Sequence, residues 1–201
     1  MAASKTGEKI LRAFMRLVVK RGFDATTTRA VAKEAGVNEV TIFRLFSDKA
    51  SLATEAFRFF NYETWNDVPT PRFPVATPRQ AALGLAAHLR AMRDGAREHL
   101  EFIQFGMSEY WRLPDIREGI KKVALASRGF ILEALKRAAP QLRPEVDLEA
   151  AAMELHAFII MTVQWSSQGW APRSEKEWNR LISAVVRPLV RSDNAVGRGS
   201  A

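Results

Sequence analysis

The sequence predicts an all-α fold. Apolar residues recur at every third or fourth position through most of the 201-residue chain, which is the spacing of one face of a helix. No turn dipeptide of the Asn-Gly kind separates alternating apolar runs, so no β-hairpin is indicated. Prolines and glycines mark the breaks between several of the helical segments.

The first expected helix covers residues 6–21. Lys20 and Arg21 lie near the negative end of its dipole, and Gly22 is suited to end it. Its apolar stripe consists of Ile10, Leu11, Phe14, Leu17 and Val18. We expect this stripe to pack across the back of the next two helices.

Two short helices with a glycine turn between them follow, over residues 28–35 and 39–46. Thr27 and Asn38 are good N-cap residues, and Gly36 can adopt the left-handed conformation that a sharp turn requires. The residues expected to face inward are Val31, Ala32, Ala35, Val37, Ile42, Leu45 and Phe46. This layout is typical of a DNA-reading helix-turn-helix, whose second helix enters the major groove.

The remaining segments are also helical. A fourth helix begins near Asp48 and turns Leu52, Ala53, Ala56, Phe57 and Phe60 inward. Four prolines within residues 68–79 predict a connector, because a helix interior does not tolerate them. Further helices are expected over residues 79–97, 98–111, 115–138, 147–167 and 175–191.

The N-terminal quarter of the chain is basic. Residues 1–50 hold ten lysines and arginines against five acidic residues, a surplus of five charges out of a net charge of +8. Such a surplus favours a polyanion such as DNA as the partner. Basic helix faces are often only solvated, however, so charge alone does not establish DNA binding.

Several classes of protein are disfavoured. The chain has no cysteine, which excludes disulfides and thiol chemistry. Its longest apolar run, residues 150–165, is shorter than the ~20 residues that cross a bilayer, and no secretory signal is evident at the N-terminus. The three histidines lack metal-ligand spacing, and no phosphate-binding or nucleophile motif occurs. We expect a cytoplasmic protein without enzyme activity, cofactor or metal.

Residues 22–49 read GFDATTTRAVAKEAGVNEVTIFRLFSDK. This stretch closely resembles the tetracycline-repressor (TetR) family of transcriptional regulators, and the likeness extends over about residues 10–52. The resemblance implies an all-helical homodimer. It also implies a DNA-binding domain over residues 1–48 and a helical effector-binding and dimerisation domain over residues 49–191. Residues 192–201 are small and polar, which predicts a disordered tail.

The resemblance also assigns the residues that would contact DNA. It places Thr27, Thr28 and Arg29 against the phosphate backbone. On the recognition helix it implies contacts from Asn38, Glu39, Val40, Thr41, Phe43 and Arg44. Their chemistry agrees, because arginine can bond guanine, threonine a base or phosphate, and valine the thymine methyl group. Phe43 stands where the family commonly has tyrosine, so it cannot donate a hydroxyl hydrogen bond to phosphate.

Lys49 and Glu39 are expected to have roles that differ from those of the other contact residues. Lys49 lies in the first turn of a helix, where the dipole disfavours a cation, so we expect it to hold a DNA phosphate there. Glu39 would repel phosphate. It therefore accepts a hydrogen bond from cytosine N4, discriminates against wrong sequences, or stabilises its own helix N-terminus.

The C-terminal region is rich in large rings. All five tryptophans and both tyrosines lie beyond residue 60, and the segment 100–111 is apolar nearly all round, which predicts a central helix. Beside a family pocket, this composition favours a small hydrophobic or aromatic effector. The candidate ligand residues are Trp65, Phe102, Gln104, Phe105, Met107, Tyr110, Trp111, His156, Gln164 and Trp165. Core packing is the alternative for each of them.

The last two expected helices carry apolar stripes that can form a dimer interface. The stripes consist of Leu155, Phe158, Ile159 and Thr162, and of Trp178, Leu181, Ile182, Val185, Val186 and Leu189. They either pair with their copies as a four-helix bundle or are buried within one chain. A palindromic operator requires two recognition helices about 34 Å apart, which favours the dimer.

Together these observations predict a dimeric, ligand-responsive regulator that binds a palindromic DNA operator. We expect a repressor that a small hydrophobic or aromatic molecule releases from DNA. Two other classes remain open from the sequence. One is a small-molecule-binding helical protein with little DNA-binding role, and the other is an adaptor that uses its basic face on a membrane or a protein.

Overall fold

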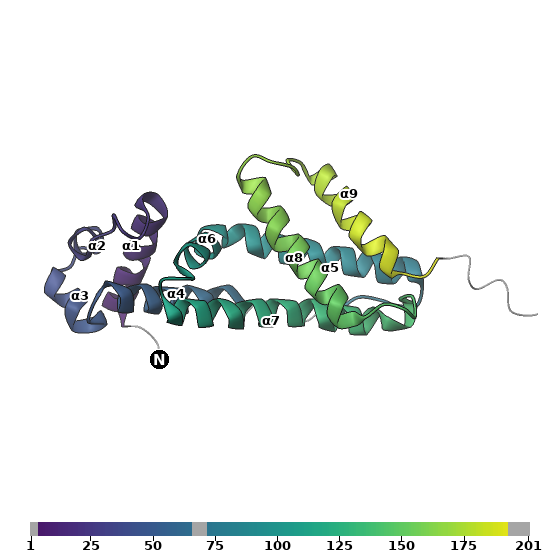
Figure 1. The fold of residues 1–201 in the computed structure, drawn as a ribbon, viewed down its shortest axis with the longest axis horizontal. Coiled ribbons are helices and arrows are strands. Elements are labelled where there is room, and N and C mark those ends of the chain that lie inside the picture. The colour runs from purple at the N-terminus through teal and green to yellow at the C-terminus, as the bar shows by residue number, and fades with distance from the viewer. Residues whose placement is uncertain (1–3, 66–71, 193–201) are drawn as a thin grey trace, which may run out of the picture. The chain divides into compact units, whose positions relative to one another are not determined.

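The computed structural model describes residues 4–65 and 72–192, without the side chains of residues 61–65. Over these residues the chain is all-α, as predicted (Figure 1). The α-helices are α1 (Lys5–Arg21), α2 (Thr28–Ala35), α3 (Glu39–Phe46), α4 (Lys49–Trp65), α5 (Pro78–Glu98), α6 (Leu100–Glu109), α7 (Pro114–Ala138), α8 (Leu148–Ser167) and α9 (Glu175–Val186). Short 3₁₀ turns follow α7 at Ala139–Gln141 and α9 at Arg187–Leu189.

The chain divides into two compact units, and the division falls within α7. The first unit contains residues 1–67 and 99–124, and the second contains residues 68–98 and 125–201. Helices α4 and α6 pack with α1 in the first unit. The domains expected over residues 1–48 and 49–191 stay a prediction, because packing units need not be separate domains. The expected disordered tail lies outside the described residues except for Ser192.

The core of the first unit is built on α1. Its predicted stripe is buried, with Ile10 and Phe14 fully so. The Phe14 ring meets Phe105 of α6 edge to face, with ring centroids 6.0 Å apart. Phe57 of α4 stacks on Phe102 of α6 at 4.6 Å. Both α6 rings therefore hold α1 and α4 against α6 through ordinary core packing.

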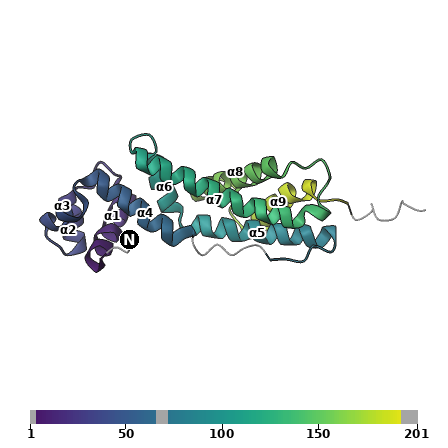
Figure 2. The ribbon, with the colours of Figure 1, turned by 90° about the horizontal axis from the view of Figure 1, so that it is seen from below.

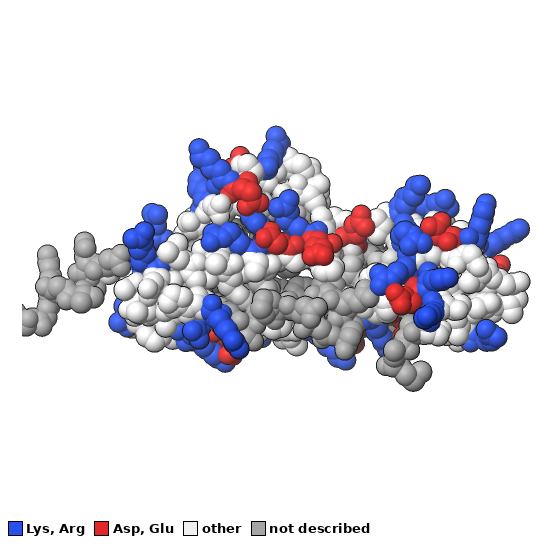
Figure 3. Space-filling model, turned by 180° about the vertical axis from the view of Figure 1, so that it is seen from behind, with Lys and Arg blue, Asp and Glu red and all other residues white. Residues whose placement is uncertain are grey.

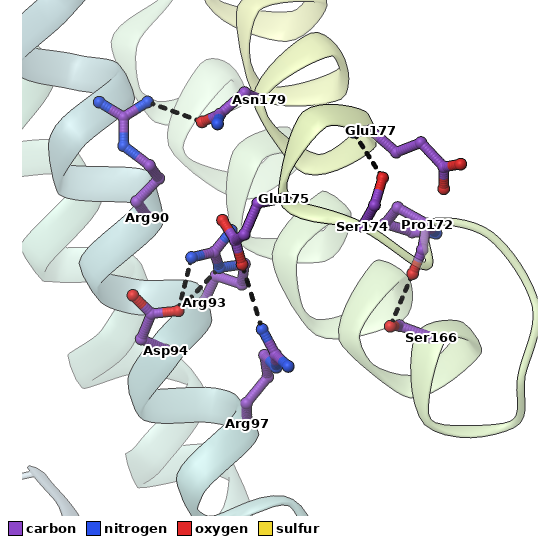
Figure 4. Close-up of polar contacts among 10 residues, drawn as sticks. All are labelled: Arg90, Arg93, Asp94, Arg97, Ser166, Pro172, Ser174, Glu175, Glu177 and Asn179. Atoms are coloured by element: carbon purple, nitrogen blue, oxygen red, sulfur yellow. Dashed lines mark hydrogen bonds and ion pairs between the residues drawn. The ribbon is translucent and has the colours of Figure 1, made fainter.

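The second unit is held together by α5. Helix α5 packs against both α8 and α9 (Figure 2). Trp178 of α9 is buried, and the guanidinium of Arg93 on α5 lies 5.3 Å from its ring centroid. Arg93 is itself only 4% exposed and forms ion pairs with Asp94 at 2.7 Å and Glu175 at 2.9 Å (Figure 4). A buried arginine needs such partners, so this cluster fixes the first turn of α9 on α5.

Three predictions from periodicity are wrong. The last helix ends at Val186 and not at residue 191, because Pro188 lacks an N–H group and crowds the preceding turn. Leu45, predicted to face inward, is exposed. The segment 100–111 is predicted to be central, yet Trp111 is 82% exposed and Met107 is also exposed. Met107 lies on α6 away from the buried Phe102 and Phe105, and Trp111 lies in the turn after α6 ends at Glu109.

Candidate nucleic-acid interface

The helix-turn-helix has the local geometry that the sequence predicts. The Thr27 hydroxyl accepts a hydrogen bond from the Ala30 amide at 3.1 Å, which caps α2. Gly36 adopts the left-handed conformation, with φ 67° and ψ 37°. The Asn38 side chain accepts from the Val40 amide at 2.9 Å, which caps α3. The two caps set where each helix begins, and the Gly36 conformation sets how the chain turns between them.

The outer face of α3 is open to solvent. Val40 is 70% exposed, and Phe43 and Arg44 are exposed with it, whereas Thr41 is half-buried. On the opposite face, Ile42 is fully buried in the core of the first unit. The helix therefore combines a fixed inner face with an outer face that presents apolar, hydroxyl and guanidinium groups. Such a surface can meet base edges in a major groove.

Basic side chains surround this helix-turn-helix. In Figure 3 the Lys and Arg side chains outnumber the acidic ones over the end of the molecule that α1, α2 and α3 form, at the right of the view. The exposed basic residues of this region include Lys5, Lys9, Arg16, Lys20, Arg21, Arg29, Lys33 and Arg44. Arg16 pairs with Glu34 of α2 at 3.2 Å. The other basic side chains of this region give the unit a positive surface suited to phosphate.

Thr28 and Glu39 contact each other. The Thr28 hydroxyl donates a hydrogen bond to a carboxylate oxygen of Glu39 at 2.6 Å, linking the first residue of α2 to the first residue of α3. The hydroxyl proton is thus engaged within the protein, and Glu39 is half-buried. The sequence interpretations of Glu39 did not include this contact, which has no signal in helical periodicity.

Lys49 also has partners within the protein. Its ammonium group donates to the Phe23 carbonyl at 2.9 Å and to the Asp24 carbonyl at 3.4 Å, and it lies 4.2 Å from the Phe23 ring centroid. The unfavourable helix dipole is therefore offset without a phosphate. The N-terminus of α4 has its own anion, because the Asp48 carboxylate accepts from the Ser51 amide at 2.7 Å. The hydrogen bonds from Ser51 lower the pKa of Asp48. Phosphate binding by Lys49 stays a prediction.

The candidate ligand residues are divided between the two units. In the first unit Phe102 and Phe105 are core residues, Met107 and Trp111 are exposed, and Tyr110 lies edge-on to Trp111. A surface pocket of about 200 Å³ in this unit is lined by Val18, Val19, Gly22, Phe23, Glu101, Gln104, Phe105 and Ser108. It contains Gln104 and Phe105 of the candidate set.

The second unit holds His156, Gln164 and Trp165. A His156 ring nitrogen lies 2.7 Å from the Ser127 hydroxyl, and burial lowers the pKa of His156, with a further contribution from the charge of Arg128. Gln164 is half-buried and Trp165 is exposed. The side chain of Trp65 lies outside the described residues. Two of the described candidates, Gln104 and Phe105, thus share a pocket, and the ligand residues as a set stay a prediction.

Sequence reasoning missed His88 on α5. It is buried, and within the described part of the chain its Nε2 atom has no hydrogen-bond partner. Burial lowers the pKa of His88, against a smaller opposing effect from the Phe130 backbone. Its position on the apolar face of α5 was the available signal. In the two described ranges, no cluster of three or more metal-ligating side chains is present, and no helix has the length and apolarity to span a membrane.

Comparison with known proteins identifies this architecture. Residues 10–56 match the family model for bacterial regulatory proteins of the tetR family. The helix-turn-helix segment of the chain is therefore of the tetR-family type. Over 47 residues it is 51% identical to YvkB of Bacillus subtilis (strain 168), which is named as an uncharacterized HTH-type transcriptional regulator. That match covers 23% of this chain and 25% of YvkB, so it spans about a quarter of the relative.

Solved structures extend the likeness over most of the chain. A bacterial regulatory protein in the tetR family from Rhodococcus RHA1 aligns with a TM-score of 0.68 and 20% identity over 94% of this chain and all (100%) of that chain. The fatty acid degradation regulator FadR from Bacillus halodurans aligns with a TM-score of 0.68 and 14% identity, over 96% of this chain and 99% of FadR. These likenesses show that the chain shares their fold.

Proposed function

We propose that this protein is a sequence-specific DNA-binding transcriptional regulator, and not an enzyme. The observation that carries the proposal is the outer face of α3, where Val40, Phe43 and Arg44 are exposed while Ile42 is locked in the core. An exposed arginine on a fixed helix can bond guanine O6 and N7, and Val40 can contact a thymine methyl group. The family-model match of this segment supports the same function.

The protein acts as a homodimer, with α8 as the main contact. The stripes expected to form the interface are largely buried within the chain itself, including Ile159 and Trp178. A different face of α8 is open. It carries Met153, Ala157, Met161 and Trp165 at intervals of four residues, and all four are exposed. We name these four residues the outer stripe of α8.

The outer stripe explains why a second copy is the partner. Four exposed apolar residues in a row on one helix are unusual for a monomer, and Trp170 beyond the helix end is also exposed. The stripe holds no charged residue, so a second copy of α8 can pack on it without burying an unpaired charge. Such a pairing is two-fold symmetric, like the palindromic site that a dimer reads.

A small hydrophobic or aromatic effector releases the repressor from DNA. Support for this step comes from the second unit, where the buried His88 can offer a hydrogen bond to a ligand in apolar surroundings. Effector binding then shifts the population between two arrangements of the DNA-binding modules. A coupling of ~1–3 kcal/mol changes operator affinity roughly 5- to 150-fold.

Selection from a random pool of duplex DNA tests the proposed function. The wild-type chain should enrich a palindromic site, and Arg44→Ala should weaken binding to that site more than to unrelated DNA. Arg180→Ala, which removes an exposed arginine of α9, is the matched control and should leave both affinities unchanged. Enrichment of no sequence would overturn the proposal. Ligand binding without DNA selection would then favour the small-molecule-binding alternative, and stronger vesicle binding would favour the adaptor.

A further inference from the structure

The loop between α1 and α2 is held by cations from two other elements. Phe23 in this loop is buried and meets Phe14 edge to face at 6.4 Å. Lys49, at the start of α4, lies 4.2 Å from the Phe23 ring centroid, and the Arg112 guanidinium, from the turn after α6, lies 5.3 Å from it. All four residues belong to the first unit.

Arg112 also binds the next residue of the loop. Its two terminal nitrogens pair with the two carboxylate oxygens of Asp24, Nη1 with Oδ2 at 3.0 Å and Nη2 with Oδ1 at 2.8 Å. This fork-to-fork geometry fixes orientation as well as distance. The Arg112 hydrogen bond lowers the pKa of Asp24, and the same contact raises the pKa of Arg112. The two residues are separated by 88 positions, so the pair joins distant parts of the chain.

Glu109 is a second acidic partner of Arg112. The Glu109 side chain is buried, and its Oε2 atom has no hydrogen-bond partner in the described ranges. Arg112 Nη1 is its ion-pair partner at 3.5 Å. The same Nη1 atom of Arg112 therefore meets a buried carboxylate of α6 and an exposed carboxylate of the loop, and both attract the guanidinium.

Hydrogen bonds within the loop connect the position of Asp24 to the start of α2. Thr26 is buried, its amide donates to the Phe23 carbonyl at 3.1 Å, and its hydroxyl donates to the Gly22 carbonyl at 2.8 Å. The next residue is Thr27, the cap of α2. Few backbone torsions between Asp24 and α2 are left free, so the position of Asp24 sets where α2 begins.

We propose that Asp24 and Arg112 are positioning residues for DNA recognition, whose ion pair fixes the first turn of α2 against the turn after α6. This inference rests on the proposed DNA binding. It predicts that the DNA affinity changes in the direction opposite to that expected from charge alone. Neutralising an acid in a DNA-binding module should by charge alone strengthen DNA binding. If Asp24 positions α2, its neutralisation should weaken binding instead.

The test uses the full-length protein and the duplex that the wild type selects from a random pool. The variants are Asp24→Asn, Arg112→Gln and the two combined. Each single change should weaken binding about two- to five-fold, the range for an exposed ion pair, and the double change should be no worse than either single one. The slope of log affinity against log salt should stay unchanged, because no phosphate contact is lost. Glu118→Gln is the matched control, since Glu118 is an exposed acid of the same unit paired with Lys121 at 2.7 Å, and it should not weaken binding.

Specific results would overturn the inference. Equal or tighter binding by Asp24→Asn would show that the ion pair does not position α2. A salt slope reduced by about 0.9 in Arg112→Gln would mean that Arg112 contacts phosphate directly. If Arg112→Gln unfolds because Glu109 loses its partner, Asp24→Asn alone decides, since the Asp24 side chain is 78% exposed. If the wild type selects no duplex, the proposed DNA-binding function itself is overturned. If the wild type selects a duplex and the variants bind it equally well, only the positioning role of Asp24 and Arg112 is overturned.

Discussion

The Thr28 hydroxyl donates a hydrogen bond to Glu39 at 2.6 Å, and this contact joins the first turns of α2 and α3. Within the protein each residue therefore has the other as a partner, and the DNA contacts that the resemblance implies for them stay a prediction. Glu39 lies at the positive end of the α3 dipole, where a carboxylate is stabilised. The contact therefore sets the angle between the two helices as well as stabilising one of them.

Glu39→Ala should lower the free energy of unfolding by about 1 kcal/mol, the usual net value of a hydrogen bond. It should also reduce the preference for the selected duplex over a scrambled one, because α3 loses a constraint while the module loses a repulsive charge. Urea unfolding and competition binding measure the two effects. Thr28→Val completes a double-mutant cycle. Strictly additive losses from the two changes would mean that the contact contributes nothing.

Lys49→Gln distinguishes an internal tether from a phosphate contact. The ammonium group binds two loop carbonyls and an aromatic ring, so we expect lower stability and an unchanged salt dependence of DNA binding. Arg44→Gln serves as the comparison, because this exposed residue has no such partners among the contacts of the described chain. A salt slope that falls by about 0.9 in Lys49→Gln would instead establish the phosphate contact that the sequence predicts.

Two histidines of the second unit, the buried His88 and the half-buried His156, should make stability depend on pH. Burial lowers the pKa of His88 and of His156 below the ordinary 6.5, so each takes up a proton more readily in the unfolded chain. Unfolding is therefore accompanied by proton uptake. The contribution of the two neutral histidines to stability is complete above the ordinary histidine pKa and is lost as the pH falls below it. Chemical unfolding from about pH 8 to about pH 5 should show this loss.

His88→Leu is the variant that isolates one of these groups. It should flatten the pH dependence, because leucine cannot be protonated in either state. His99→Leu provides the control, since it removes a histidine from the other unit, at the N-cap position of α6. A pH dependence that His88→Leu leaves unchanged would mean that His88 titrates alike in the folded and unfolded chains.

Sequence patterns within a few residues predicted the helix-turn-helix, but they did not predict the long-range contacts that hold it in place. The caps Thr27 and Asn38 and the left-handed Gly36 each depend on residues within four positions, and all were confirmed. The pairing of Arg112 with Asp24 spans 88 positions, and helical periodicity carries no information on it. The same limit explains Trp111, because periodicity shows which residues are apolar but not whether another helix covers them.

The outer stripe of α8 provides the remaining prediction. Met161→Glu places a charge at the centre of the proposed dimer contact, where the partner chain would have to bury it unpaired. Sedimentation should show monomers at concentrations where the wild type is a dimer. Affinity for a palindromic site should fall by about 10²- to 10⁴-fold towards that for a half-site, because the second module no longer binds from the same molecule.

Leu125→Glu is the control for that change. Leu125 is an apolar residue of α7 in the same unit and is 59% exposed, so the substitution adds an equal charge outside the outer stripe. It should leave both the dimer and the affinity for the palindrome intact. If both variants dissociate the dimer, added charge and not its location is responsible. If neither does, the second copy docks on another face and α8 remains exposed in the assembly.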